Sequence, residues 1–396
     1  MSTHALCDRR ARPDPSTAAR GGPLAGRPGS AGSWFVPSPS DATAGVSNTP
    51  LSANSVDAFR VLAACQAFGG LGMSQEPFHL PVMLDEVLEL LAPVPAGLVL
   101  DATLGGAGHV AALLDARPDV VLLGCDQDPE AVAAGRARLE RFGERADVVN
   151  QRFDRLGEAL EASRFAEIPV VAVLFDLGVS SHQLNVAARG FSYRHEAPLD
   201  MRMDPRHGRS AADLVNTMEP AELARLFARH GEERFARQIV RAIVSHRPIT
   251  TTTELAALVA ATVPPSARRR GHPAARVFQA LRVEVNEELA ILPGALDAAI
   301  DLLAPGGRIV VLAYHSGEDR IVKQRLSLAA TGGCRCPAGL PCVCGARAKV
   351  VLLHRGARRP SPMEVAENPR ASAARLRAAE RRSFDRGVEG PEASAS

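Results

Sequence analysis

Residues 98–109 read Leu-Val-Leu-Asp-Ala-Thr-Leu-Gly-Gly-Ala-Gly-His. The apolar run that ends at Asp101 predicts a buried strand, and a helical pattern at 110–117 follows the small-residue loop 105–108. A strand, a glycine turn and a helix start are typical of a nucleotide-type ligand site, because glycine lets the backbone approach a ligand and the helix start offers N–H groups. The spacing is not Gly-x-Gly-x-x-Gly, which argues against a dinucleotide. A tight strand-to-helix turn without a ligand is the plainer alternative.

Strands and helices alternate around this loop. An amphipathic helix is expected at 84–91, before the first strand. Apolar and β-branched runs predict later strands at 120–126, 146–150, 170–176, 308–314 and 349–354. Helical patterns are found at 129–142, 155–162, 211–263, 282–303 and 318–329. This order predicts an α/β fold with a parallel, doubly wound sheet, interrupted by an all-helical insertion.

Composition divides the chain into segments. Residues 1–72 are rich in Pro, Gly, Ser and Ala and read as a disordered N-terminal tail, and 383–396 as a disordered end. A transit peptide, or a translation start at Met73, are alternatives for the first segment. The core is then expected in two parts, at 73–203 and 283–382, with the helical insertion at 204–282.

Charge is unevenly distributed along the chain. The stretch 73–203 holds eleven basic and twenty acidic residues, whereas 204–282 holds thirteen basic and seven acidic ones. A basic insertion beside an acidic core favours a phosphate-bearing partner, although ordinary solvated charge explains such runs more often. The apolar runs are too short for a transmembrane helix. With no secretion signal either, we expect a reduced, cytoplasmic protein.

Acidic residues stand at the predicted strand ends. Asp101, Asp126 and Asp176 each close a strand, and a cluster of ionisable groups follows the 308–314 strand. Ligands of open parallel sheets bind beyond these carboxyl ends. Asp126 lies 21 residues beyond Gly105, which suits a carboxylate that accepts both ribose hydroxyls. The alternative is that these groups cap helices or form structural ion pairs.

Four of the seven cysteines are close together. Cys334, Cys336, Cys342 and Cys344 form two Cys-x-Cys pairs separated by five residues. Four thiolates are the composition of a structural zinc site, although the spacer is short and Cys-x-x-Cys is the more usual pair. Reduced thiols without a metal are the alternative.

Several stretches together resemble one family, in order from about residue 77 to 382. They are Phe78–Val87, Asp101–His109, Asp176-Leu-Gly-Val-Ser-Ser-His-Gln-Leu184, Arg189-Gly-Phe-Ser-Tyr193, Pro198-Leu-Asp-Met-Arg-Met-Asp-Pro205, Gly231–Ala236, His272-Pro273 with Arg276–Ala280, His315-Ser-Gly-Glu-Asp-Arg320 and Glu367-Asn-Pro-Arg370. The sequence is similar to the bacterial 16S rRNA cytosine-N4 methyltransferases, called methyltransferase H or MraW. The Asp-Met-Arg-Met-Asp-Pro run is highly specific among these motifs.

This resemblance implies an S-adenosylmethionine-dependent enzyme with a Rossmann-like methyltransferase domain and a helical insertion. Its substrate would be N4 of a cytidine in the decoding region of the small ribosomal subunit. The family's cofactor contacts carry over onto Ala107, Gly108, His109, Asp126, Phe153, Asp176 and Gln183, to which the loop itself adds Asp101 and Gly105. Two departures are visible. Ala107 replaces the family's usual glycine, and Gly317 stands where leucine is frequent.

The expected chemistry needs a proton acceptor beside the exocyclic amine, because the nitrogen loses a proton as it is methylated. Asp176 is the first candidate, and His315, Glu318 and Asp319 are second candidates. We expect Phe191 and Tyr193 to clamp the target base and Arg268, Arg269 and Arg270 to contact RNA phosphates.

Three other functions fit parts of the pattern. A nicotinamide dehydrogenase would want the missing Gly-x-Gly-x-x-Gly run. A DNA amino-methyltransferase would want an Asp/Asn-Pro-Pro-Tyr run, which is also missing. A non-catalytic RNA-binding or ribosome assembly protein would not need the three strand-end carboxylates. Oligomeric state stays open.

Overall fold

The computed structural model describes residues 81–231, 233–266, 272–337 and 343–383. All of them belong to one compact unit, Phe59–Ser396. The predicted tail at 1–72, the predicted end at 383–396 except Ser383, the Arg268–Arg270 run and Cys342 lie outside the described residues. Among the described helices, none combines the length and the apolar character that a membrane crossing requires.

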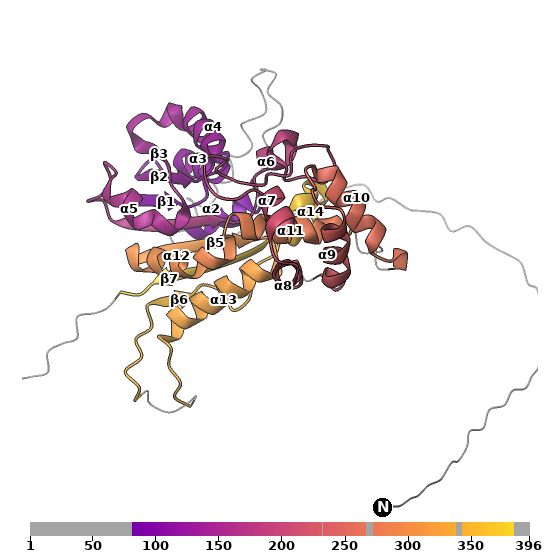
Figure 1. Cartoon of the computed structure of the whole chain (residues 1–396). Coiled ribbons are helices and arrows are strands. Elements are labelled where there is room, and N and C mark those ends of the chain that lie inside the picture. Colours follow the sequence, from indigo (N-terminus) through magenta and orange to yellow (C-terminus); the bar gives the residue numbers. More distant parts are fainter. Residues whose placement is uncertain (1–80, 232, 267–271, 338–342, 384–396) are drawn as a thin grey trace, which may run out of the picture. The chain divides into compact units, whose positions relative to one another are not determined.

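A seven-stranded sheet forms the centre of the fold, in the order β3-β2-β1-β4-β5-β7-β6. The first five strands run parallel, and β7 is antiparallel to both β5 and β6. The strands are β1 Gly97–Asp101, β2 Val120–Asp126, β3 Ala146–Asn150, β4 Val170–Asp176, β5 Leu303–Ala313, β6 Val350–Leu352 and β7 Arg375–Arg381 (Figure 1). The predicted strands are confirmed, but β7 is an additional strand, so the expectation of an all-parallel sheet is wrong.

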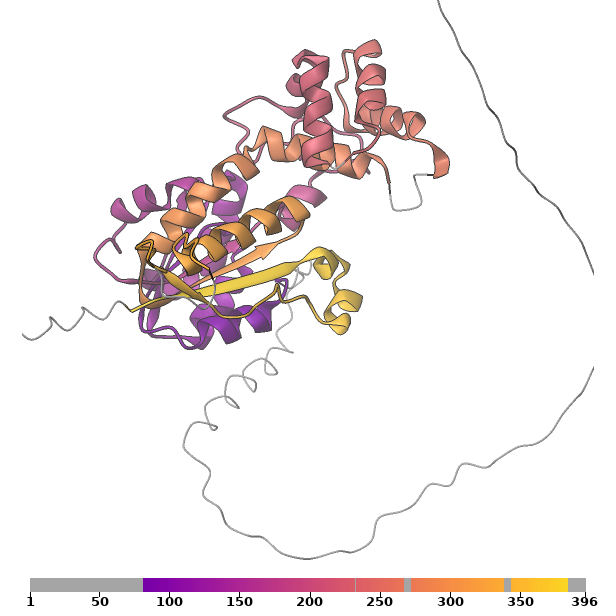
Figure 2. The same ribbon diagram turned by 90° about the horizontal axis from the view of Figure 1, so that it is seen from below.

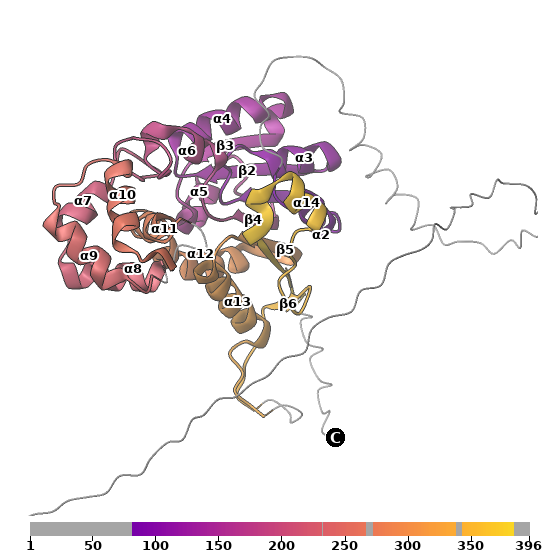
Figure 3. The ribbon, with the colours of Figure 1, turned by 90° about the vertical axis from the view of Figure 1, so that its right-hand side faces the viewer.

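Helices cover both faces of this sheet (Figures 1 and 3). Side chains alternate along a strand, so Leu98 and Leu100 pack on the face of α5, α12 and α13 while Val99 packs on the face of α2 and α3. These helices are α2 Leu84–Leu91, α3 Gly108–Ala116, α4 Pro129–Leu139, α5 Leu156–Glu161, α12 Glu288–Leu302 and α13 Ser316–Thr331. The doubly wound, Rossmann-like fold is therefore confirmed.

A separate apolar cluster holds the helical insertion, which leaves the sheet after β4 and returns through α12. Its helices are α6 Ser181–Asn185, α7 Ala211–Thr217, α8 Pro220–His230, α9 Ala236–Ser245, α10 Thr252–Thr262 and α11 Ala274–Val285 (Figure 2). The helix α14 Pro362–Glu367 and the short 3-10 turns Glu140–Arg145, Phe153–Arg155, Ala187–Arg189 and Pro369–Ala373 complete the described elements.

The helix predicted at 282–303 is two helices, which corrects the expectation. The chain breaks at Glu287, whose φ is 54°. The neighbouring Asn286 side chain donates a hydrogen bond to the Met201 carbonyl at 2.9 Å and accepts one from the Met203 N–H at 2.8 Å. These bonds tie the break to the Asp-Met-Arg-Met-Asp-Pro loop, so long-range contacts override the continuous helical pattern.

Candidate active site at the strand ends

A cavity of about 460 Å³ opens at the carboxyl ends of β1, β2, β4 and β5. This is where open α/β sheets bind their ligands, and the volume suits a small molecule. Most of the predicted site residues line it. They are Asp101, Gly105, Gly108, His109, Asp126, Phe153, Asp176, Gln183 and Glu318.

The loop after β1 brings its backbone to the cavity. A Cβ on Gly108 would lie 2.5 Å from the Pro81 ring, so only glycine fits there without movement. Ala107 has the left-handed φ of 56° and is buried against the α2–α3 side of the core. Ala107 is absent from the cavity lining, so its predicted cofactor contact stays a prediction. The positive φ explains why glycine suits this position, since a Cβ there costs about 1–2 kcal/mol.

The β1 and β2 carboxylates both line the cavity, where Asp101 is buried and Asp126 is partly exposed. Asp126 accepts hydrogen bonds from the N–H of Gly105 at 2.8 Å and of Asp128 at 2.9 Å. Burial raises the pKa of Asp126 to about 6 despite these bonds. Burial, with the nearby charges of Asp176 and Asp126, raises the pKa of Asp101 to about 8. At neutral pH Asp126 is therefore largely ionised, whereas Asp101 holds a proton that a cationic ligand would displace.

The β4 carboxylate lies between two partners. Tyr314 donates a hydrogen bond from its hydroxyl to Asp176 Oδ1 at 2.7 Å, and His109 Nδ1 lies 3.6 Å from Asp176 Oδ2. The other ring nitrogen of His109, Nε2, is 2.9 Å from the Val82 carbonyl oxygen. A carbonyl only accepts, so Nε2 carries the proton and Nδ1 faces Asp176 with a lone pair in the neutral ring. Burial raises the pKa of Asp176, while the charge that His109 carries in its protonated form and the bond from Tyr314 oppose this.

An ionic cluster closes the opposite side of the cavity. Arg282 makes two 2.9 Å hydrogen bonds to Glu288 and lies 3.6 Å from Glu318. His315 Nε2 lies 3.0 Å from Glu318 as well. Burial alone would raise the pKa of Glu318, but His315 and Arg282 outweigh it and lower the pKa. Glu318 is therefore a charged group that these neighbours hold in place.

Two predicted proton acceptors lie outside the cavity lining. His315 instead caps α13, where its Nδ1 accepts from the Gly317 N–H at 3.1 Å. Asp319 accepts hydrogen bonds from Arg375 and Arg377, so it fastens β7 to α13. Both side chains make structural contacts, which favours supporting roles for Asp319 and His315 over catalytic ones.

Known proteins are similar to this chain over most of its length. The sequence profile described as the MraW methylase family matches residues 76–382. The chain belongs to the MraW methylase family. A relative from Acidothermus cellulolyticus named ribosomal RNA small subunit methyltransferase H is 51% identical over 76% of this chain and 93% of its own. Proteins of the same name from Thermobifida fusca and Mycobacterium tuberculosis are 50% and 47% identical, over 78% and 80% of this chain and 94% and 85% of their own.

A solved structure, a putative methyltransferase from Streptococcus mutans in complex with SAH, matches 78% of this chain and 99% of its own. The identity is 11% and the TM-score 0.36, so the resemblance is distant.

The cavity of this MraW-family chain fits S-adenosylmethionine in its chemistry. Asp126 ends β2 where a carboxylate can accept from ribose hydroxyls, and Gly105 and Gly108 of the loop both line the cavity. The carboxylates Asp101 and Asp176 offer negative charge to a ligand that carries a sulfonium and an ammonium group. Phe153 adds an apolar wall to the cavity. Its ring packs edge-to-face against Phe175, with ring centroids 6.0 Å apart.

Two further residues build the frame of this cavity. Gln183 donates from Nε2 to Asp128 at 2.8 Å and accepts the Ser180 N–H at 2.9 Å. Arg189 is buried and forms ion pairs with Asp128 at 2.9 Å and Glu130 at 2.7 Å. Arg189 also donates to the carbonyls of residues 202 and 203.

Sequence reasoning missed the roles of Arg189, His109 as a proton partner, Arg282, Glu288 and Tyr314. The one signal for Arg189 was its place at the head of the Arg-Gly-Phe-Ser-Tyr motif. The other four roles depend on side-chain directions that spacing alone does not determine.

The structure places the two residues of the predicted aromatic clamp differently. Phe191 is 6% exposed and belongs to the insertion's apolar cluster, so its ring is committed to that core and not available to a ligand. Tyr193 is half-buried, stacks on His272 with ring centroids 4.7 Å apart and touches Phe278 edge-on. The role of Tyr193 in base binding stays a prediction.

Proposed function

We propose that this chain transfers a methyl group from S-adenosylmethionine to N4 of a cytidine in 16S rRNA of the small ribosomal subunit. The observation that carries this proposal is Asp176, a carboxylate with a 29% exposed side chain at the cavity, held between Tyr314 and His109. The names of the relatives support a ribosomal RNA substrate. The position in the decoding region rests on the motif resemblance.

Asp176 positions the exocyclic amine and receives its proton. The bound cofactor supplies an electrophilic methyl group on sulfur. Oδ1 of Asp176 is occupied by the Tyr314 hydroxyl, so Oδ2 is the atom that accepts an N4–H hydrogen bond. This bond orients the nitrogen lone pair toward the methyl carbon, and such orientation supplies about 7–11 kcal/mol of the barrier reduction.

His109 then holds the proton that Asp176 accepts. The Val82 carbonyl fixes the hydrogen on Nε2, which leaves Nδ1 as the only ring atom able to take up another proton. The separation of 3.6 Å from Oδ2 is longer than a hydrogen bond, and catalytic contacts of this kind shorten when substrate binds. The proton thus moves from N4 to Asp176 Oδ2 and on to His109 Nδ1.

The helical insertion offers a basic surface for the RNA. The helix α9 buries Ile239, Val240 and Ile243 and exposes Arg237 and Arg241, which are four residues apart on one face. Among the described residues, neither arginine has an ion-pair partner. Free guanidinium groups of this kind contact phosphate oxygens without reading sequence.

The decisive experiment supplies labelled S-adenosylmethionine to the full chain together with 30S subunits, and separately free 16S rRNA, from cells lacking this modification. We expect label on one cytidine, at N4, as mapped by nuclease digestion and mass spectrometry. Label on a ring carbon, on another nucleotide or on DNA would refute the proposal. Binding to the RNA without any transfer would favour the non-catalytic alternative.

A further inference from the structure

The described residues of the connection between α13 and β6, 332–337 and 343–349, are mostly exposed. It leaves α13 at Thr331 and reaches β6 at Val350, and Val343 within it is 89% exposed. Its two described limbs extend from the sheet side by side (Figures 1 and 3). A segment that buries so little apolar surface needs another source of order to offset its conformational entropy.

Three cysteine sulfurs converge in this connection. The Sγ atoms of Cys334, Cys336 and Cys344 all lie within 4.8 Å of one another. The Cys334 and Cys344 sulfurs are 3.6 Å apart. A disulfide bond requires about 2.05 Å, whereas two thiolates on one zinc ion, each about 2.3 Å from it in a tetrahedron, are about 3.8 Å apart. The observed separation matches a shared metal.

The backbone around the thiols turns tightly. Gly333 and Gly345 adopt positive φ values of 74° and 71°, which favour glycine. Each glycine directly precedes or follows one of the converging cysteines, Cys334 and Cys344. The turns thus lie where the two limbs bring their thiols together.

The base of the connection is closed by the backbone. Lys349 donates its N–H to the Ala329 carbonyl at 2.7 Å, and a Cβ on Gly332 would collide with the backbone of Arg347. The two limbs are therefore held together at the base, and the converging thiols lie beyond it.

We propose that Cys334, Cys336 and Cys344 bind a zinc ion that fastens the α13–β6 connection. Three thiolates leave one position of the tetrahedron for a fourth donor. Zinc is favoured over harder cations because the donors are all sulfur. The site lies apart from the cavity, since none of the three cysteines lines it.

The test measures metal in the full chain, purified under reducing conditions from zinc-supplemented cells. We expect one zinc per chain by elemental analysis. Cobalt exchanged into the same site should show the intense sulfur-to-metal charge-transfer bands of tetrahedral thiolate coordination. Each of Cys334→Ser, Cys336→Ser and Cys344→Ser should weaken zinc affinity by more than the roughly 10- to 100-fold typical of groups that only support a ligand.

Cys65→Ser is the matched control, because it also removes one thiol and should leave the zinc content unchanged. Alkylation of the three thiols should be slow in the zinc-loaded chain and fast after chelation. Zinc content that is zero, or equal in all four variants, would overturn the proposal. A Cys334–Cys344 disulfide in place of metal, detected by mass spectrometry of the reduced preparation, would overturn it too.

Discussion

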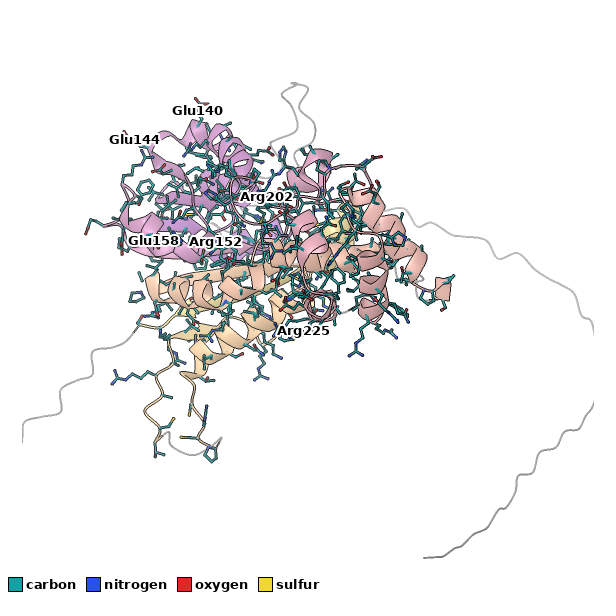
Figure 4. The ribbon with its side chains drawn as sticks, viewed as in Figure 1. Glu140, Glu144, Arg152, Glu158, Arg202 and Arg225 are labelled. Carbon is teal, nitrogen blue, oxygen red and sulfur yellow. The ribbon has the colours of Figure 1, made fainter. Side chains whose placement is uncertain are left out.

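The cavity and the helical insertion use charge in opposite ways. At the strand ends, carboxylates line the cavity, and desolvation raises the pKa values of Asp101 and Asp126. On the insertion, Arg225, Arg237 and Arg241 are exposed, and Figure 4 shows Arg225 on α8, whereas Glu140, Glu144 and Glu158 lie over the β1–β3 half. Removing a charge from water costs free energy, but a desolvated charge interacts strongly with a ligand that fits it. An exposed charge costs little and interacts only weakly with any one partner. The difference assigns small-molecule chemistry to the sheet and phosphate contact to the insertion.

Removing the carboxylate at β4 should have the largest effect. Asp176→Asn keeps the shape but cannot accept the N4 proton, so kcat at saturating cofactor and 30S subunits should fall by about 10²–10⁴-fold. Asp115→Asn, at the surface, is the control and should retain full turnover. Equal turnover in the two variants would show that the site's chemistry lies elsewhere.

The second-largest effect should come from breaking the ion pair between Arg189, at the start of the insertion, and Asp128, at the start of α4. Arg189→Met leaves the buried Asp128 without its ion-pair partner, which typically costs about 3–5 kcal/mol. Urea denaturation followed by circular dichroism measures this loss. Arg194→Met, which removes an exposed arginine five residues away, should change the unfolding free energy by less than about 0.5 kcal/mol. A small loss of unfolding free energy for Arg189→Met would show that Asp128 does not depend on this ion pair to remain buried.

The carboxylates Asp101 and Asp126 should make the affinity for the cofactor depend on pH. Asp126 and Asp101 have pKa values raised to about 6 and about 8, so at neutral pH Asp101 still holds its proton. A cationic ligand favours the ionised carboxylates, so its binding releases protons. Its affinity should therefore rise between about pH 6 and about pH 8, by at most about tenfold per pH unit for each proton released.

Calorimetry in two buffers of different ionisation enthalpy measures the released protons directly. Asp101→Asn should abolish the part of this release seen near pH 8. A dissociation constant for S-adenosylmethionine that is flat across this range would contradict the assignment of both carboxylates to the cofactor.

The same raised pKa values also affect folding. Because the folded chain holds these protons more tightly than the unfolded chain, the stability that they contribute is fully present below the unfolded pKa of about 3.8 and is lost as pH rises through about 6 and about 8. The ligand-free chain should therefore unfold at a lower urea concentration at the alkaline end of this range, and the cofactor should reverse that trend.

The exposed arginines of α9 should make the affinity for RNA depend on salt concentration. Neutralising Arg237 and Arg241 together as glutamines should weaken RNA binding about uniformly across sequences and reduce the slope of log affinity against log salt by about 1–2. Cofactor affinity should not change. Arg155→Gln, an exposed arginine on the sheet's side, is the control. If the slope of log affinity against log salt is unchanged in the double variant, α9 does not contact the RNA.

The smallest effect should come from the loop before α3. Ala107→Gly relieves the left-handed backbone, worth about 1–2 kcal/mol, but removes a buried methyl group worth about 0.8 kcal/mol. We expect a net stabilisation of no more than about 1 kcal/mol in urea unfolding. Ala111→Gly, inside the same helix, should destabilise by about 1 kcal/mol. If both substitutions destabilise equally, the methyl packing outweighs the backbone strain.

The sheet was predictable because its central strands are apolar runs that end in a carboxylate. β7 was not, because its sequence, Arg-Leu-Arg-Ala-Ala-Glu-Arg, has little β-branched character. Its pairing depends on contacts such as Asp319 with Arg375 and Arg377, which come from distant segments. The break at Glu287 was missed for the same reason.

Some features of the candidate site could be predicted from sequence and others could not. Carboxylates at strand ends follow from strand boundaries, so Asp101, Asp126 and Asp176 were found from sequence. The proton on His109 Nε2 and the bond from Tyr314 depend on where side chains point, which no spacing encodes. Phe191 was wrongly assigned because an aromatic residue near a site serves the local core as readily as a ligand.

The place of β7 in the sheet has a consequence for the order of folding. This strand is formed by Arg375–Arg381 yet lies between β5 and β6, so the sheet cannot close until synthesis has passed residue 381. Until then β5 presents an open edge, and open edges invite aggregation. A chain shortened before residue 375 should therefore collect as insoluble material.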